Sequence, residues 1–151
     1  MKKHQPFRYY LRVRYGECDQ QGVVFNARYG EYVDLACTEF LNLALGRSEI
    51  AAGTFEMQVV KLLIEWTAPA RYNDALEITV ALKKLGTTSF TLGFAMRKHG
   101  TSETIVTAET VNVHIEPKSW TKSAIPETLR TQLAAGAAGH IVDHAGVFTQ
   151  T

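Results

Sequence analysis

The stretch 29-YGEYVDLACTEFLNLALG-46 decides the fold, because it is the one long segment of this chain that keeps a helical hydrophobic period. Its apolar residues recur every three or four positions, as they do on one face of a helix: Tyr29, Tyr32, Val33, Ala36, Phe40, Leu43 and Ala44. Glu31 and Asp34 fall on another face, and Gly46 is suited to end a helix. The sequence therefore predicts one long amphipathic helix.

The segments outside this helix have the period of two that is typical of β-strands. Apolar and polar side chains alternate along three of them: residues 7–15, 75–84 and 89–98. Gly86 and the stretch 99-HGTS-102 separate the later segments by short, hairpin-like turns. Such turns favour antiparallel neighbours.

Two further strands are irregular. In residues 102–117, valines alternate with polar side chains, so His114 is expected to face solvent. The parity changes near Glu109, which predicts a bulge or a change of burial there. Residues 55–66 are apolar on both parities after Val59, so this strand is expected to be covered on both faces.

The order of these elements is one strand, the long helix and four more strands. This order predicts an α+β domain in which an antiparallel five-stranded sheet wraps around a long central helix. A short helix is expected at residues 125–134, with Pro126 in its first turn, and the small residues after it indicate a flexible segment. We therefore expect a single domain over residues 1–135 and a flexible C-terminal tail over residues 136–151.

The composition excludes several classes of function. A chain of 151 residues with 46% hydrophobic residues and a formal net charge of +1 is typical of a globular domain, without the positive field that nucleic-acid binding requires. The longest apolar run is far shorter than the roughly 20 residues of a membrane span, and the first residues do not resemble a secretion signal. We expect a cytoplasmic protein. Cys18 and Cys37 form no CxxC pair, which predicts two reduced thiols.

The well-known cofactor and hydrolase motifs are missing. The sequence contains no GxGxxG, P-loop or GxSxG pattern, so we expect no bound cofactor. His140, Asp143 and His144 could serve as metal ligands, but they lie in the expected flexible tail. Because a metal site needs a fixed geometry and supporting hydrogen bonds, we expect no metal centre.

One acidic residue stands out in the stretch 16-GECDQQGVVFNARYGEY-32, where Asp19 lies in a turn just before the long helix. A carboxylate in a turn commonly caps backbone amides. It can also do chemistry, because a helix start offers unpaired N–H groups that could polarise a carbonyl while the carboxylate attacks it or activates water. Gly22 allows the chain to fold back tightly enough for both parts to meet. The residues alone leave both interpretations open.

The same stretch resembles the signature of the 4-hydroxybenzoyl-CoA thioesterase family of hotdog-fold proteins. The residues at matching places are Arg12, Val13, Cys18, Asp19, Gly22, Val23, Val24 and Tyr29. The long helix, the loop 69-PARYND-74 and the segment 111-VNVHIEPKSWTKSAIP-126 are also similar to the family. The resemblance thus extends beyond the motif to most of the chain.

The resemblance implies that the protein hydrolyses an acyl-CoA thioester to free acid and CoA. Asp19 would act as nucleophile or as general base, and the sequence does not decide between them. A backbone N–H near Asn26 would polarise the carbonyl, although many members carry His or an aromatic residue there. The other predicted substrate contacts are Gly22, Val24, Phe25 and Tyr29 at the helix start and, for the CoA phosphates, Arg71, Lys83 and Lys84.

The resemblance also implies a homodimer or homotetramer, because hotdog thioesterases pair their sheets edge to edge and build each active site from two subunits. Residues 57–61 of a second copy would then help to close the acyl pocket. Cys18 is a rival nucleophile, but no obvious base for its thiol lies nearby in the sequence. Two other functions stay open: a thioesterase or hydratase acting on acyl carrier protein, and a non-catalytic acyl-CoA-binding module in which Asp19 only holds the turn.

Overall fold

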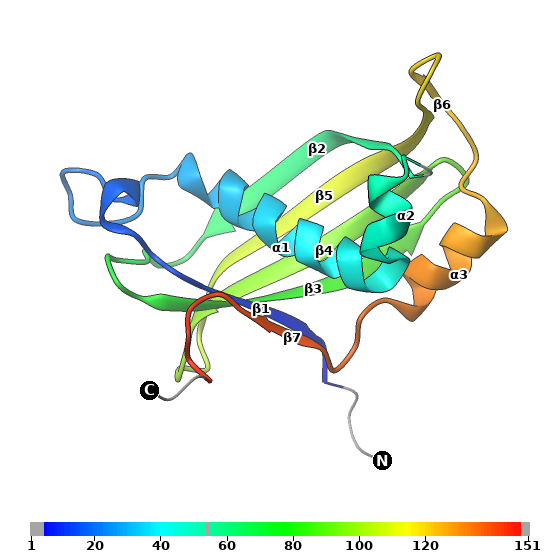
Figure 1. Cartoon of the computed structure of the whole chain (residues 1–151). Coiled ribbons are helices and arrows are strands. Elements are labelled where there is room, and N and C mark those ends of the chain that lie inside the picture. Colours follow the sequence, from blue (N-terminus) through cyan, green and yellow to red (C-terminus); the bar gives the residue numbers. More distant parts are fainter. Residues whose placement is uncertain (1–4, 54, 149–151) are drawn as a thin grey trace.

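The computed structural model describes residues 5–53 and 55–148 (Figure 1). A short 3₁₀-helix (Tyr15–Glu17) precedes the long helix. The other elements, in chain order, are β1 (Phe7–Arg12), α1 (Arg28–Leu45), α2 (Arg47–Ala51), β2 (Met57–Trp66), β3 (Ala75–Leu85), β4 (Ser89–Lys98), β5 (Thr104–Glu116), β6 (Thr121–Lys122), α3 (Glu127–Ala135) and β7 (Ile141–Asp143). Of the helices in the described ranges, none is long and apolar enough to cross a membrane.

The strands form one sheet in the order β2-β5-β4-β3-β1-β7, and its concave side holds α1 (Figure 1). The five long strands pair antiparallel, as predicted. Two short strands were not predicted: β7 pairs in parallel with β1, and β6 pairs with β5. The sheet is therefore mixed, and it has seven strands instead of five.

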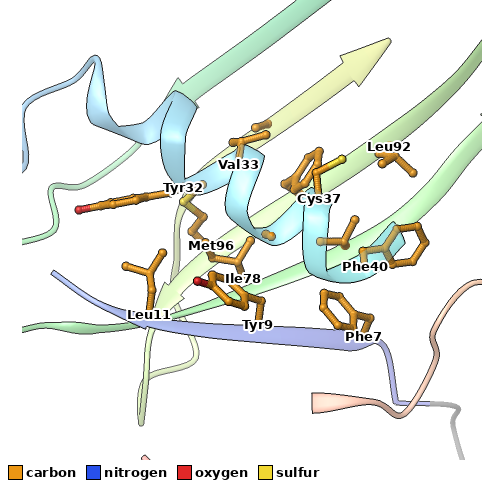
Figure 2. Close-up of a cluster of buried hydrophobic side chains, with 14 of the residues drawn as sticks. Phe7, Tyr9, Leu11, Tyr32, Val33, Cys37, Phe40, Ile78, Leu92 and Met96 are labelled. Atoms are coloured by element: carbon orange, nitrogen blue, oxygen red, sulfur yellow. The ribbon is translucent and has the colours of Figure 1, made fainter. Parts of the chain in front are cut away.

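The core lies between α1 and the concave side of the sheet. Figure 2 shows alternate residues of β1 pointing toward the helix, with Phe7 packed edge-on against Phe40 at a ring-centroid distance of 5.7 Å. Tyr32 and Val33 on α1 are also almost completely buried. Each large apolar side chain that leaves water contributes about 1.5–3 kcal/mol, so this helix face holds the sheet in its curved form. The helix ends where expected, at Gly46, whose φ of 91° favours glycine.

The prediction for β5 was wrong in two respects. The register shift lies where β5 passes Met96 and Arg97 of β4, so the strand keeps one parity through Glu109. Thr110, Asn112 and His114 consequently face the core and are buried. Several of these polar groups find local partners: Asn112 Nδ2 donates to Thr110 Oγ1 (3.0 Å), and His114 Nδ1 lies 2.8 Å from Ser123 Oγ, whereas Asn112 Oδ1 has no partner within the described ranges. Such partners offset the cost of burying polar atoms, which an alternation pattern does not register.

The described part of the segment expected to be a flexible tail, residues 136–148, contributes strand β7 to the sheet, and residues 149–151 lie outside the described ranges. The N–H of Arg8 donates to the carbonyl of His140 (3.1 Å), and the N–H of His144 donates to that of Tyr10 (2.9 Å). The Asp143 carboxylate accepts N–H groups of the following turn, including that of Gly146 at 2.8 Å. These bonds cover the free edge of β1, and the three residues of β7 are too short a run to reveal a strand in the sequence.

At the opposite edge, β2 is uncovered within one chain. Most of its residues are exposed, although the sequence predicted cover on both faces. The exposed large apolar side chains of this strand are Val59, Val60, Leu62, Leu63 and Trp66. If β2 is covered on both faces as predicted, the covering surface must come from outside the described part of this chain.

Candidate active site

Asp19 lies at the tip of a small hairpin that joins the 3₁₀-helix to α1. Cys18 bridges to Val24, the N–H of Asp19 donates to the Val23 carbonyl (2.9 Å), and the N–H of Gly22 donates to the Asp19 carbonyl (3.0 Å). Gly22 has a φ of 76°, a conformation that residues with a Cβ rarely adopt. Asp19 Oδ1 accepts the N–H of Gln21 at 2.8 Å. Within the described ranges, Asp19 Oδ2 accepts no hydrogen bond. The carboxylate is half-buried and therefore both held and accessible.

Glu17, two residues earlier, fastens this hairpin to the helix and was missed by the sequence analysis. Its buried carboxylate accepts the backbone N–H of Arg14 (2.8 Å) and the hydroxyl of Tyr32 (3.0 Å) through Oε1 and pairs with the Arg14 guanidinium (3.2 Å) through Oε2. Burial raises the pKa of Glu17, but these hydrogen bonds outweigh it and hold the pKa below its usual value. Glu17 is therefore ionised at neutral pH, and the only sequence signal for it was an acidic residue next to an apolar run.

An open groove of about 440 Å³ lies beside the hairpin, between the start of α1 and the end of β2. Its lining residues are Val23, Val24, Asn26, Tyr29, Trp66, Thr67, Ala68 and Pro69. The rings of Tyr29 and Trp66 meet edge-on, 5.7 Å apart, and form an aromatic wall. Trp66 was not among the predicted contacts, because it is separated from the motif in sequence and only the fold brings it to the helix start.

The groove is rigidly framed on the side of the loop after β2. The N–H of Ala70 donates to the Tyr29 hydroxyl (3.1 Å), and the Ala70 carbonyl accepts the N–H of Val24 (2.9 Å). Tyr29 is almost fully buried, so its hydroxyl acts here as a structural acceptor. Phe25 is half exposed, and its N–H donates to the Glu17 carbonyl (2.9 Å).

The start of α1 presents unpaired donors beside the groove. Of the hydrogen bonds formed within the described part of the chain, none uses the N–H of Asn26 or of Ala27. Asn26 is exposed, lines the groove and accepts the N–H of Tyr29 through its carbonyl (3.3 Å). A helix start with free N–H groups carries partial positive charge and can stabilise a developing oxyanion. The helix start thus offers free amide donors beside an apolar groove, and the hairpin that carries Asp19 borders this groove through Val23 and Val24.

The three cations predicted for the CoA phosphates lie in different places. Arg71 directly follows Ala70, near the groove, and its N–H donates to Asp74 Oδ2 (2.8 Å). Lys83 and Lys84 lie near the other end of β3. The strand register sets Lys84 level with Lys61 of β2, so at about 3.3 Å per residue the two lysines lie roughly 20 Å along the strands from the groove, and three strands away from β2 across the sheet. The Lys83 side chain lies against Gly93 of β4, where a Cβ would overlap it.

The residues considered as metal ligands have other partners. The Asp143 carboxylate accepts backbone N–H groups, and Nδ1 of His144 lies 3.0 Å from the Tyr9 hydroxyl. No group of three or more His, Cys, Asp or Glu side chains within residues 5–53 and 55–148 is arranged to hold a metal ion. The Cys37 thiol is buried, which raises its pKa to about 12 and makes it a poor nucleophile.

Comparisons with known proteins place this fold and site in a family. A model of the thioesterase-like superfamily matches residues 13–133, and the chain therefore belongs to this superfamily. The acyl-CoA thioester hydrolase YbgC of Escherichia coli is 31% identical over 125 residues, which are 82% of this chain and 92% of that protein. These matches support the prediction of a thioester hydrolase.

Solved structures agree. The gentisyl-coenzyme A thioesterase BH1999 is 26% identical and has a TM-score of 0.74, with 84% of this chain and 99% of that chain covered. The PA5185 protein of Pseudomonas aeruginosa is 26% identical with a TM-score of 0.78, covering 87% and 92%. The predicted hotdog fold is thus confirmed. The matched model describes the wider superfamily, so the 4-hydroxybenzoyl-CoA subfamily stays a prediction.

Proposed function

We propose that the protein is an acyl-CoA thioesterase that hydrolyses its substrate at the groove between Asp19 and the start of α1. The observation that carries this proposal is that the hairpin bearing the half-buried Asp19 carboxylate borders a groove through Val23 and Val24, and that Asn26, whose N–H is free, lines the same groove at the helix start. Membership of the thioesterase-like superfamily and the similarity to an acyl-CoA thioester hydrolase support the substrate class. The aromatic wall formed by Tyr29 and Trp66 suits an aryl acyl group, consistent with the 4-hydroxybenzoyl-CoA assignment.

In the proposed reaction the thioester carbonyl oxygen accepts hydrogen bonds from the helix start. Asp19 then either attacks the carbonyl carbon to form an anhydride, which water hydrolyses, or takes a proton from a water that attacks the carbon. In both routes the C–S bond breaks and the CoA sulfur leaves as a thiolate that is protonated. The hydrogen bond from the Gln21 N–H holds one carboxylate oxygen, and in this proposal the other would face the substrate.

A second copy of the chain completes the site in this proposal. β2 is an uncovered, apolar edge strand, and the groove lies at its end. Antiparallel pairing of two β2 strands about a two-fold axis would protect both edges and bring the far end of the second sheet toward the groove. Residues 57–61 of the second copy would then help to close the acyl pocket. A closed dimer is the minimum assembly, and a tetramer can be built from two such dimers.

The CoA phosphates would be held by Arg71 from the same chain and by Lys83 and Lys84 from the second copy. In one chain the two lysines lie near the far end of β3, and antiparallel pairing of two β2 strands would bring that end of the second sheet toward the groove. Acyl carrier protein is the alternative carrier, and a non-catalytic acyl-CoA-binding module is the alternative class. Hydrolysis is favoured over binding alone because the free N–H groups at the helix start do not stabilise the turn that contains Asp19, whereas they could stabilise an oxyanion.

The direct test replaces Asp19 with Asn and measures release of free thiol from a panel of aryl and aliphatic acyl-CoA substrates. Asn keeps the shape of the side chain but cannot act as nucleophile or base, so kcat should fall by at least about 10²-fold. Gln20→Glu, which changes charge at the neighbouring exposed position, is the matched control and should keep nearly full activity. Hydrolysis by Asp19→Asn at the wild-type rate would show that the assignment is wrong. A wild-type protein that binds acyl-CoA without releasing thiol would favour the binding module.

A further inference from the structure

A second polar site lies on the convex side of the sheet, opposite α1. A cavity of about 250 Å³ opens there across β1, β3, β4 and the start of β5. Its charged and hydroxyl-bearing lining residues are Arg8, Glu77, Thr79, Arg97, Ser102 and Thr104. Neighbouring residues in β1 point into the core, so Arg8 points to this outer side. We call this site the outer-face cavity.

Among the described residues that line this cavity, the one carboxylate, that of Glu77, already accepts hydrogen bonds from two other side chains. Glu77 is buried, its Oε2 accepts the Tyr10 hydroxyl at 2.6 Å, and its Oε1 accepts Arg97 Nε at 2.8 Å. Burial raises the pKa of Glu77, but these partners outweigh it and hold the pKa below its usual value. Glu77 is therefore ionised and neutralises one guanidinium, that of Arg97.

Arg8 forms no ion pair among the residues that the structure describes, and the Glu77 carboxylate, which bonds Arg97, attracts it only through space. Its Nη1 reaches the Tyr10 hydroxyl only at 3.5 Å, which is a weak contact. Its Nε is buried and has no hydrogen-bond partner within the described ranges. Burying a guanidinium donor without an acceptor is costly, and such sites are normally completed by a partner. Two arginines and one carboxylate leave the cavity with one uncompensated positive charge.

We propose that the outer-face cavity binds a small oxyanion, either a carboxylate or a phosphate group, between Arg8 and Arg97. A guanidinium presents a planar fork of donors that matches two oxygens of either anion. Only Nε of Arg97 is engaged by Glu77, so its other nitrogens remain available, and the hydroxyls of Ser102 and Thr104 at the rim can donate as well. The anion supplies the acceptor that Arg8 Nε lacks.

This site is independent of the proposed hydrolysis. It opens on the face of the sheet away from α1, whereas the groove beside Asp19 lies between α1 and the end of β2. Occupancy would fasten β1 to β3 and β4, because Arg8 and Arg97 come from different strands. A bound anion should therefore stabilise the fold, whatever its effect on activity.

The test titrates the full-length protein with inorganic phosphate and, separately, with acetate at constant ionic strength, and follows amide and arginine Nε–H resonances by NMR. Saturable shifts at Arg8, Thr79 and Arg97 are expected, and the anion that binds more tightly identifies the source. Arg8→Gln should weaken binding by about tenfold or more. Arg12→Gln is the matched control, because Arg12 lies on the same strand and face but bonds the carbonyls of Asn73 and Ala145.

A second variant protects the test against a folding defect. Thr79 pairs directly across from Arg8, so Thr79→Glu places a carboxylate beside the unpaired guanidinium. This variant should melt at a higher temperature than the wild type in anion-free buffer and should no longer respond to phosphate or acetate. The proposal is overturned if neither anion gives saturable shifts, or if Arg12→Gln weakens binding as much as Arg8→Gln does.

Discussion

The two edges of the sheet are finished in different ways. The β1 edge is closed by the chain itself, because β7 pairs with Arg8–Tyr10 and the Asp143 carboxylate fixes the turn that follows. The β2 edge is open, with most of its residues exposed and large apolar side chains on both faces. A free apolar edge is a hazard that proteins normally cover. Within one chain, the β1 edge is covered by β7 and the β2 edge stays exposed.

The difference indicates which edge serves function. The groove beside Asp19 ends at Trp66, the last residue of β2, whereas no part of its lining comes from β1 or β7. Closing the β1 edge therefore contributes stability, and pairing of the β2 edge would contribute both stability and the missing wall of the site. Changes at the two edges should consequently have different effects.

The largest effect is expected from Val60→Asp at the open edge. Val60 is 62% exposed in the single chain, so the substitution should leave the protomer folded while placing a charge in the proposed interface. The dimer should dissociate and thioester hydrolysis should fall by about 10²-fold or more, because a one-copy site no longer positions the substrate. Size-exclusion chromatography with an activity assay measures both.

Ile141→Asp is the matched substitution at the closed edge. Ile141 is 41% exposed and lies on β7, so it is comparable in exposure and chemistry to Val60. The oligomer mass and kcat should both stay close to the wild-type values, with at most a lower melting temperature. Equal losses of activity in the two variants would remove the distinction between the edges.

A smaller effect is expected from Glu17→Gln, which loosens the link between the end of β1 and the helix at the groove. Removing this buried, multiply bonded carboxylate should cost about 1–3 kcal/mol of unfolding free energy at neutral pH. The pKa of Glu17 is lowered in the folded state, so its contribution is present above the unfolded pKa and is lost as pH falls through the folded value. In denaturant titrations across pH, the wild type and the variant should therefore begin to converge in stability once the pH falls below about 4.3, the ordinary pKa of Glu, and should converge fully only below the lowered pKa of the folded state.

Glu31→Gln provides the control for that experiment. Glu31 pairs with Arg28 at 3.0 Å, but both side chains are substantially exposed. An exposed pair of this kind is worth about 0.3–0.5 kcal/mol, so the control should be nearly neutral. A Glu17→Gln variant as stable as the control at pH 7 would show that the buried carboxylate does not hold the hairpin.

The double variant Lys83→Ala with Lys84→Ala tests whether a second copy reaches across the open edge. If these lysines hold the CoA phosphates, KM for acyl-CoA should rise roughly tenfold at low salt with kcat little changed. The difference should shrink as salt is added, because exposed charges are screened over about 8–10 Å. Arg71→Ala provides the comparison, because Arg71 lies near the groove of its own chain and would contact the CoA phosphates without a second copy. An unchanged KM at both low and high salt would remove the two lysines from the site.

The smallest effect is expected from Asn26→Ala. If only the backbone N–H of residue 26 faces the substrate, the loss should be less than tenfold, against roughly 10²–10³ for a lost oxyanion donor. Steady-state kinetics on the best substrate of the panel measure it. A loss as deep as that of Asp19→Asn would mean that the side chain takes part.

Much of the fold could be predicted, because the hydrophobic periodicity of a long helix or strand can be recognised within one segment of the sequence. The helix from Tyr29 to Gly46 and the five main strands follow from such periods, and the fold class is confirmed. The partners that finish the structure could not be predicted. β7 spans only three residues and is held by backbone bonds to β1, and the buried His114 has a partner in Ser123. These contacts join residues whose proximity exists only after folding.

The candidate site divides in the same way. The motif grouped Asp19, Gly22 and Asn26; the structure places Asp19 and Gly22 in the hairpin before α1 and Asn26 in the lining of the groove, and their roles in catalysis stay a prediction. Glu17 and Trp66 were missed, because one acts through buried hydrogen bonds and the other arrives from the end of β2. Lys83 and Lys84 were grouped with the site by charge alone, and in one chain they lie far from it.

The most direct test of the account is a dilution series in which mass by light scattering and thioesterase activity are measured on the same samples. The account predicts a species of at least twice the 16.8 kDa chain mass, with activity that falls in step as the protein dissociates. The single, dissociated chain should be inactive, because its unpaired β2 edge leaves the groove near the Asp19 hairpin incomplete. A stable and fully active species at the mass of a single chain would contradict both the pairing of the open edge and the shared site.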